Sequence, residues 1–107
     1  MNCRVELTAT ATEDLRSIAL YIAEQSQDKK IAAGFVKQLQ ETCKILEDFP
    51  ESGAIPKDRV LMSAGYRFLV HKDYLIFYNY EKDKNTAYIL AVFNAKRDYM
   101  RVMKKFL

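Results

Sequence analysis

The sequence predicts an α+β sandwich in which a short strand, two helices, three strands and a short last helix follow one another along the chain. Three observations lead to this order. Apolar residues recur every three or four positions between residues 11 and 49, which is the period of an amphipathic helix. From Val60 onward the period becomes two, as in a strand. The turn-rich segment 50–56 separates the two halves, so we expect the helices to cover one face of the sheet.

The chain opens with a predicted strand and a first helix. Residues 3–7 alternate between apolar and polar side chains, as expected of a short strand. The hydroxyls of residues 8–12 can cap a helix, and Thr10 with Glu13 has the spacing of a capping box. One face of that helix then carries Ala11, Leu15, Ile18 and Ile22.

A second helix is predicted after the polar break at residues 25–28. Asp28 can cap this helix, and Pro50 cannot continue it. Its apolar stripe consists of Ala32, Phe35, Leu39, Cys43, Leu46 and Phe49. A joint this short implies that the two helices form an antiparallel hairpin. Gly34 interrupts the second helix, where either a close helix contact or simple tolerance accounts for it.

The second half of the chain predicts an antiparallel meander followed by a helix. Three β-rich runs cover Tyr66–His71, Tyr74–Glu81 and Thr86–Asn94, and the gaps between them suit hairpin turns. We expect the order β-α-α-β-β-β and then a helix over residues 98–106. The apolar face of that helix carries Tyr99, Val102, Met103 and Phe106.

Composition limits the class of protein. The 107 residues suffice for one domain, 1–107, and contain no low-complexity linker. No apolar run approaches the roughly 20 residues that cross a bilayer, and no secretory leader opens the chain, so we expect a cytoplasmic protein without a membrane partner. Cys3 and Cys43 lack metal-binding spacing and are expected to be reduced thiols. No motif for a metal or an organic cofactor is present in the sequence, so none is expected.

Charge is distributed unevenly along the chain. Residues 1–56 carry 6 Lys/Arg and 9 Asp/Glu, whereas residues 57–107 carry 11 and 5, so the net charges are −3 and +6. The second half would attract phosphate or an acidic protein, or serves only solubility. The candidate contact residues are Arg59, Arg67, Lys96, Arg97, Arg101, Lys104 and Lys105. Arg67 heads the first strand of the meander, where it is either a site residue or a solvent-facing strand residue. As a site residue, it is expected to lie beside the cations that follow the last strand.

Four segments, in this order, resemble the RelE/ParE superfamily of bacterial toxins from type II toxin–antitoxin pairs. They are the first helix from Leu7 to Ile22, the Pro-x-x-Gly break at Pro50–Gly53, the strands containing Gly65-Tyr66-Arg67 and Tyr74–Tyr78, and the tail Val92–Tyr99. The resemblance implies an α+β toxin that forms a hetero-oligomer with a small antitoxin. That antitoxin is expected to be partly disordered when free and to bind through an acidic or amphipathic segment.

Two activities follow from the resemblance. ParE-like toxins poison DNA gyrase by binding it. The long helical hairpin, the Pro-x-x-Gly loop and the Tyr-Leu-Ile-Phe-Tyr strand are most similar to that branch. Under this interpretation Arg67 and the basic tail are contact residues.

RelE-like toxins instead cut messenger RNA in the ribosomal A site without a metal, by attack of a ribose 2′-OH on the adjacent phosphate. That reaction needs a base, a stabiliser of negative charge and an acid. The resemblance assigns Arg67 to the phosphate, Lys96 or Arg97 to the developing charge, and Tyr99 to a reacting oxygen. Lys57 is a possible base, and Arg59 could lend further charge.

One position departs from the nuclease pattern. Asn94 lies near where several nuclease members have a histidine, and a neutral amide cannot shuttle a proton. The single histidine, His71, is expected at a strand end. The sequence therefore favours gyrase binding over RNA cleavage, with a non-toxic module that retains only antitoxin binding as a third possibility.

Overall fold

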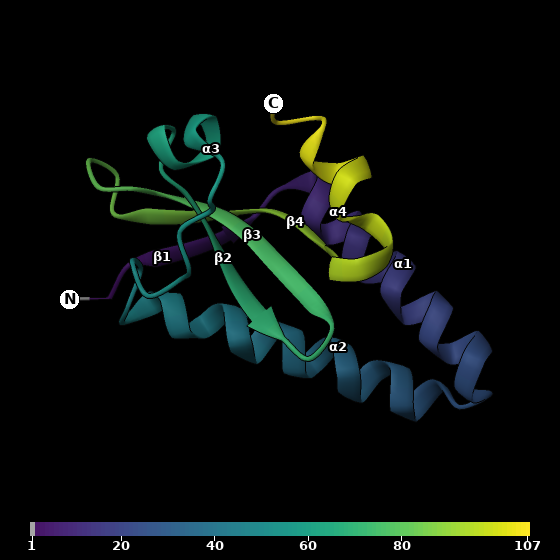
Figure 1. Ribbon diagram of the computed structural model, residues 1–107. Helices are drawn as coiled ribbons and strands as arrows, with labels where there is room; N and C mark the ends of the chain where they lie inside the picture. Colours follow the sequence, from purple (N-terminus) through teal and green to yellow (C-terminus); the bar gives the residue numbers. More distant parts are fainter. Residues whose placement is uncertain (1) are drawn as a thin grey trace.

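The computed structural model describes residues 2–107 as a four-stranded sheet between a helical hairpin and a smaller helical layer (Figure 1). The strand order is β1-β4-β3-β2. β1 (Arg4–Leu7) pairs in parallel with β4 (Thr86–Asn94). β4 and β2 (Tyr66–His71) both pair antiparallel with β3 (Tyr74–Glu81). None of the helices in residues 2–107 combines the length and the hydrophobicity of a membrane-spanning segment.

The α+β class and the bounds of the three meander strands are confirmed. Both connecting turns contain a residue in the left-handed region, Lys72 with φ 53° and Asn85 with φ 47°. Asparagine tolerates this conformation better than most residues. Its side chain also fixes the second turn, because Asn85 accepts a hydrogen bond from the Tyr80 hydroxyl at 2.8 Å and donates one to the Asn2 carbonyl at 3.2 Å.

The hairpin consists of α1 (Ala9–Ser26) and α2 (Lys29–Lys44). Asp28 caps α2, as predicted, by accepting from the Lys30 backbone N–H at 2.8 Å. The capping box at Thr10 was wrong, because the hydroxyl of Thr8 caps α1 by accepting from the Ala11 N–H at 3.1 Å. The same hydroxyl donates to the Ile89 carbonyl at 2.9 Å, so the start of α1 is fixed by the last strand.

The second helix ends earlier than the apolar stripe predicts. α2 stops at Lys44 and tightens into the 3₁₀ turn η1 (Ile45–Glu47), which buries Leu46 and leaves Phe49 64% exposed. Two backbone carbonyls at this end of the helix accept hydrogen bonds from Cys3 near the start of the chain. The Cys3 N–H donates to the Glu47 carbonyl at 2.7 Å, and its thiol donates to the Leu46 carbonyl at 3.1 Å. Cys3 and Cys43 are both buried free thiols, as expected.

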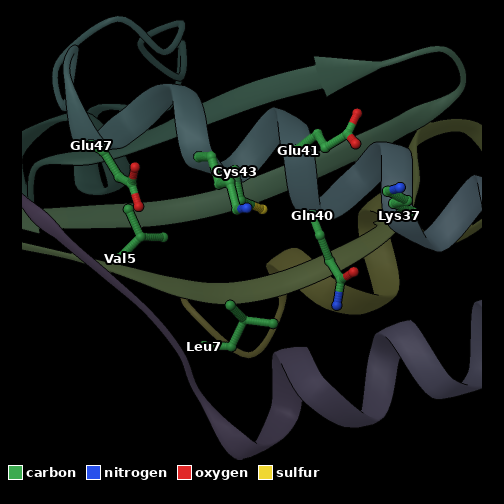
Figure 2. A pocket seen from close by; sticks show the side chains of 8 residues that line it. Val5, Leu7, Lys37, Gln40, Glu41, Cys43 and Glu47 are labelled. Atoms are coloured by element: carbon green, nitrogen blue, oxygen red, sulfur yellow. The ribbon is translucent and has the colours of Figure 1, made fainter.

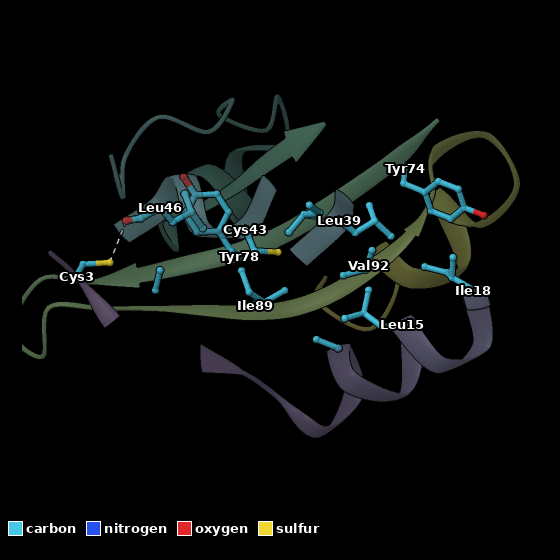
Figure 3. Close-up of a cluster of buried hydrophobic side chains, with 13 residues drawn as sticks. Cys3, Leu15, Ile18, Leu39, Cys43, Leu46, Tyr74, Tyr78, Ile89 and Val92 are labelled. Carbon is cyan, nitrogen blue, oxygen red and sulfur yellow. Dashed lines mark hydrogen bonds between the residues drawn. The ribbon is translucent and has the colours of Figure 1, made fainter. Parts of the chain in front are cut away.

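The larger core lies between the hairpin and one face of the sheet (Figure 3). Leu39 and Leu46 from the α2–η1 segment meet Ile76, Tyr78 and Ile89 from the sheet, and all five are essentially without solvent contact. Burying a large aliphatic side chain contributes roughly 1.5–3 kcal/mol, so this layer holds the hairpin on the sheet.

Helices cover both faces of the sheet, which corrects the expectation of one covered face. A second core joins α3 (Arg59–Ser63) and α4 (Ala95–Met103) to the opposite face. It contains Leu61, Phe68, Phe77, Ala91, Phe93, Val102 and Met103.

Two boundaries around this second core were also wrong. The strand period predicted from Val60 begins only at Tyr66, because Asp58 caps α3 through the Val60 and Leu61 N–H groups. The last helix begins at Ala95 rather than at residue 98, because the Asn94 side chain accepts from the N–H groups of Lys96 and Arg97.

Gly34→Ala is expected to stabilise the protein by about 0.5–1 kcal/mol, because alanine loses less backbone entropy in a helix. A Cβ at position 34 would meet no atom within 4 Å, which excludes close helix contact as the reason for the glycine. The change is measured as a rise in the guanidinium midpoint at unchanged slope. A lower midpoint would contradict this expectation.

Candidate functional site

Arg67 lies on the hairpin face of β2, against the loop that follows η1. Its Nη1 donates to the Gly53 carbonyl at 3.0 Å, and its Nη2 lies 3.8 Å from a Glu51 carboxylate oxygen. The side chain is 24% exposed. Because neighbouring strand residues point to opposite faces, Phe68 enters the second core on the other side of the sheet. Arg67 is therefore a half-buried anchor of the loop.

The loop at Pro50–Gly53 is fixed from beneath by Tyr78. The hydroxyl of Tyr78 donates to the Pro50 carbonyl and accepts from the Gly53 N–H, both at 2.9 Å. Burial raises the pKa of this phenol above its ordinary value, whereas the Gly53 hydrogen bond and the nearby Arg67 charge lower it. Ala54 and Phe68 complete the attachment with a pair of backbone hydrogen bonds. The Pro-x-x-Gly motif is thus a rigid surface loop.

α4 packs its apolar side on the face of the sheet opposite Arg67, and its first turns border α1 of the hairpin. Tyr99, Val102, Met103 and Phe106 face the second core, and five exposed cations occupy the rest of the segment: Lys96, Arg97, Arg101, Lys104 and Lys105. The Arg97 guanidinium lies 4.8 Å from the centre of the Tyr21 ring on α1. Asp98 pairs with Arg97 at 3.3 Å and with Arg101 at 3.4 Å.

The remaining candidate residues are also dispersed. Tyr99 is half-buried, with its ring centre 6.3 Å from that of Phe68 and 6.5 Å from that of Phe93. Lys57 and Arg59 are exposed at the start of α3. The candidate nuclease residues therefore do not converge on one point.

The two residues weighed as proton carriers have other contacts. Asn94 caps α4 and so has a structural reason to be an amide. His71 is a partly exposed strand-end residue whose Nε2 lies 3.1 Å from the Gln38 amide oxygen and whose Nδ1 lies 3.5 Å from the Thr42 hydroxyl. Among the residues that the structure places, no group of His, Cys, Asp and Glu side chains is arranged to hold a metal ion.

A groove of about 440 Å³ runs between the free edge of β1 and α2 (Figure 2). Val5 and Leu7 contribute its apolar side from β1. The opposite side is polar, with Cys43 behind it, and burial raises the pKa of the Cys43 thiol to about 11. The full lining is Val5, Leu7, Lys37, Gln40, Glu41, Cys43, Lys44 and Glu47. An apolar strand edge opposite a charged helix suits an amphipathic peptide.

Sequence reasoning missed this groove and the support of the Pro-x-x-Gly loop. In the sequence, Tyr78 is one of several aromatic residues of the sheet. Its contact with the loop is a hydrogen bond to Gly53, 25 positions away, which only the structure shows. The cap at Asn94 had a local signal, an asparagine directly before a charged helical turn. The stacking of Arg97 on Tyr21 joins segments 76 positions apart and leaves no such signal.

Comparison with known proteins gives a consistent assignment. The model of a family described as "ParE toxin of type II toxin-antitoxin system, parDE" matches residues 5–99. No curated protein matches the sequence significantly.

Solved structures share the fold at low sequence identity. A chain of the chromosomal ParDE system from P. aeruginosa superposes with a TM-score of 0.71 at 19% identity, covering 86% of this chain and 95% of that chain. A chain of the RelBE2 toxin–antitoxin complex from Mycobacterium tuberculosis has a TM-score of 0.62 at 24% identity, covering 88% and 92%. A doubly substituted E. coli RelE toxin in the free state has a TM-score of 0.65 at 12% identity, covering all of both chains.

Proposed function

Because the chain belongs to the ParE toxin family of type II toxin–antitoxin systems, we propose that this toxin arrests growth by binding DNA gyrase and has no chemistry of its own. The dispersal of the candidate catalytic residues carries the proposal. General acid–base cleavage of RNA requires groups within hydrogen-bond reach of the same phosphate. Arg67 contacts Gly53 on one face of the sheet, whereas Tyr99 packs on the other.

A toxin that acts only by binding its target does not need side chains that meet at one phosphate. A rigid surface element suffices, and the fixed Pro-x-x-Gly loop is of that kind. We further propose that residues 1–107 act as a single domain, since both cores share the same sheet.

The target is tested by assaying the purified toxin against two systems side by side. Inhibition of gyrase supercoiling with accumulation of cleaved DNA, and intact messenger RNA on programmed ribosomes, is the expected result. Transcripts cut in the ribosomal A site would replace the gyrase proposal with the RelE-like one. Normal growth on expression in a host without the antitoxin would identify the third possibility, a non-toxic module.

The antitoxin is proposed to place an amphipathic segment in the groove between β1 and α2, forming a hetero-oligomer. β1 has a strand partner on one side only, so its outer N–H and C=O groups are available to a partner chain. Apolar side chains of the segment would contact Val5 and Leu7, and its polar side would face Lys37 and Lys44. A segment that is disordered when free and orders on binding can follow the open edge of β1.

Leu7→Asp is expected to weaken antitoxin binding at least tenfold, because the substitution places a charge on the apolar side of the groove. Leu7 is 38% exposed, so the fold should tolerate the change. Leu20→Asp, at a 63% exposed position on α1, is the matched control. Titration calorimetry with the antitoxin encoded beside the toxin measures both affinities. An unchanged affinity for Leu7→Asp would place the antitoxin elsewhere.

A further inference from the structure

The net positive charge of the molecule is concentrated in α4 and the turn that follows it. Residues 95–107 contain five basic side chains and one acidic side chain, which gives +4, whereas the whole chain carries +3. The remaining residues therefore sum to −1. α2 also carries four lysines, but residues 27–49 contain four carboxylates as well and sum to zero. The tail is the part of the molecule that would attract an anion at a distance.

Three of these cations form one line along α4, on the side where Arg97 and Arg101 border α1. Arg97, Arg101 and Lys104 follow the i, i+4, i+7 spacing of a single helix face. That face lies opposite the buried stripe, which consists of Tyr99, Val102, Met103 and Phe106. The backbone stays helical as far as Lys104, whose N–H donates to the Met100 carbonyl at 3.2 Å. The line is thus a fixed feature of the fold.

The length of the line matches a nucleic-acid backbone. Seven residues at about 1.5 Å each place Arg97 and Lys104 about 10.5 Å apart along the axis. Phosphates of one duplex strand recur about every 3.4 Å along the DNA axis, so the line spans about three of them.

The arginines are partly preorganised for this contact. Arg97 is held over the Tyr21 ring at 4.8 Å, and Asp98 contacts both Arg97 and Arg101. Asp98 is 17% exposed, whereas the arginines are 52% and 64% exposed, so the carboxylate lies beneath the line and the guanidinium groups face outward. Asp14 on α1 also lies near Arg101. Two carboxylates still leave most of the donors of the two arginines free, since each guanidinium has five.

We infer that Arg97, Arg101 and Lys104 bind the phosphate backbone of duplex DNA. The inference rests on the proposed gyrase target, because gyrase is an enzyme that holds duplex DNA. Nucleic-acid-binding surfaces of proteins are dominated by positive charge, whereas protein–protein interfaces have an apolar centre. Beside this line of cations, Met100 is an exposed apolar residue. The surface therefore resembles a nucleic-acid-binding surface more than a protein–protein interface. The contact would carry no sequence preference, because phosphates position a protein without specifying bases.

The test measures binding of the toxin alone to a fluorescein-labelled duplex of about 30 base pairs by anisotropy, over about 50–200 mM salt. Three phosphate contacts predict a slope of about −2.7 in log K against log salt, which is a loss of about 40-fold across that range. The variant R97Q/R101Q/K104Q should lose this salt dependence, and Lys104→Gln alone should reduce the slope by about one. The control K30Q/K37Q/K44Q removes the same charge from exposed positions on α2 and should retain the wild-type slope.

A second measurement separates DNA from protein partners. R97Q/R101Q/K104Q should bind DNA-free gyrase and the antitoxin within about twofold of wild type, and bind the gyrase–DNA complex at least tenfold more weakly. Duplex binding that is unchanged in this variant would overturn the inference, as would an equal loss of affinity for DNA-free gyrase or for the antitoxin. Failure of the wild-type toxin to inhibit supercoiling would overturn the proposed function instead, because duplex binding is measured without gyrase.

Discussion

Gly53→Ala is expected to lower the free energy of unfolding by about 3 kcal/mol, because no space exists for a methyl group at this position. A Cβ there would lie 2.6 Å from two atoms of the Tyr78 side chain and 2.8 Å from the Phe68 carbonyl oxygen. Tyr78 cannot move away without breaking its hydrogen bonds to Pro50 and Gly53, and the Phe68 carbonyl belongs to the sheet. The loss is measured as a lower guanidinium midpoint.

The control for this substitution is the same chemical change at Gly34. That site is open, so one methyl group should stabilise the protein at position 34 and destabilise it at position 53. Opposite signs would show that space, and not glycine as such, decides the outcome. Wild-type stability for Gly53→Ala would mean that the loop moves freely, and would remove the rigid loop from the proposed gyrase contact.

Asp14→Ala is expected to cost about 1–3 kcal/mol, because a backbone donor in the sheet loses its partner. β1 pairs with β4 only as far as Ile89, so the β4 backbone beyond that point has no strand on this side. The Asp14 carboxylate takes over by accepting from the Val92 N–H at 2.9 Å. Asp14→Asn keeps an acceptor of similar size and should retain most of the stability, as chemical denaturation of both variants would show.

The pH dependence of Asp14 provides a second measurement. Burial raises the pKa of Asp14 above its ordinary 3.8, and the charge of Asp98 raises it further, while the Val92 hydrogen bond and the cations Lys105 and Arg101 lower it. The folded protein therefore holds the proton more tightly than the unfolded chain does. The protonated Asp14 carboxyl therefore contributes to the free energy of unfolding. This contribution is complete below about pH 3.8 and is lost as the pH rises through the raised pKa.

Asp14→Asn does not titrate, so its stability relative to wild type should increase as the pH rises through this window and then level off. Paired denaturation curves between about pH 3.5 and 6.5 measure the difference. A difference that stays constant, or that decreases with rising pH, would show that the carboxyl is not destabilised by its surroundings.

The strands could be predicted from local pattern because their limits are set locally. In each strand, the alternation of apolar and polar side chains ends at residues that tolerate a tight turn. The strands of the meander begin and end where this pattern predicts. The early end of α2 was not predictable in this way. Its apolar stripe continues to Phe49, and only the bonds from Cys3 to η1 show why the helix tightens before that point.

The candidate site was predicted in composition but not in arrangement. The sequence identifies the cations and the aromatic residues of the last helix, and the structure places them on the expected helix faces. It does not reveal which face of the sheet α4 crosses, because that depends on packing between Phe106, Tyr66 and Phe77. Arg67 was therefore expected beside the tail, and the structure places it on the opposite face.

The parallel pairing of β1 with β4 has a consequence for synthesis. Arg4 pairs with Thr86, so 82 positions separate two residues that share one ladder. β1 leaves the ribosome long before β4 exists and cannot pair until the residues between them have been synthesised. Contacts of such long range form slowly. The nascent toxin can acquire its hairpin early, but its outermost strand, and with it the groove between β1 and α2, is completed only after β4 has been synthesised.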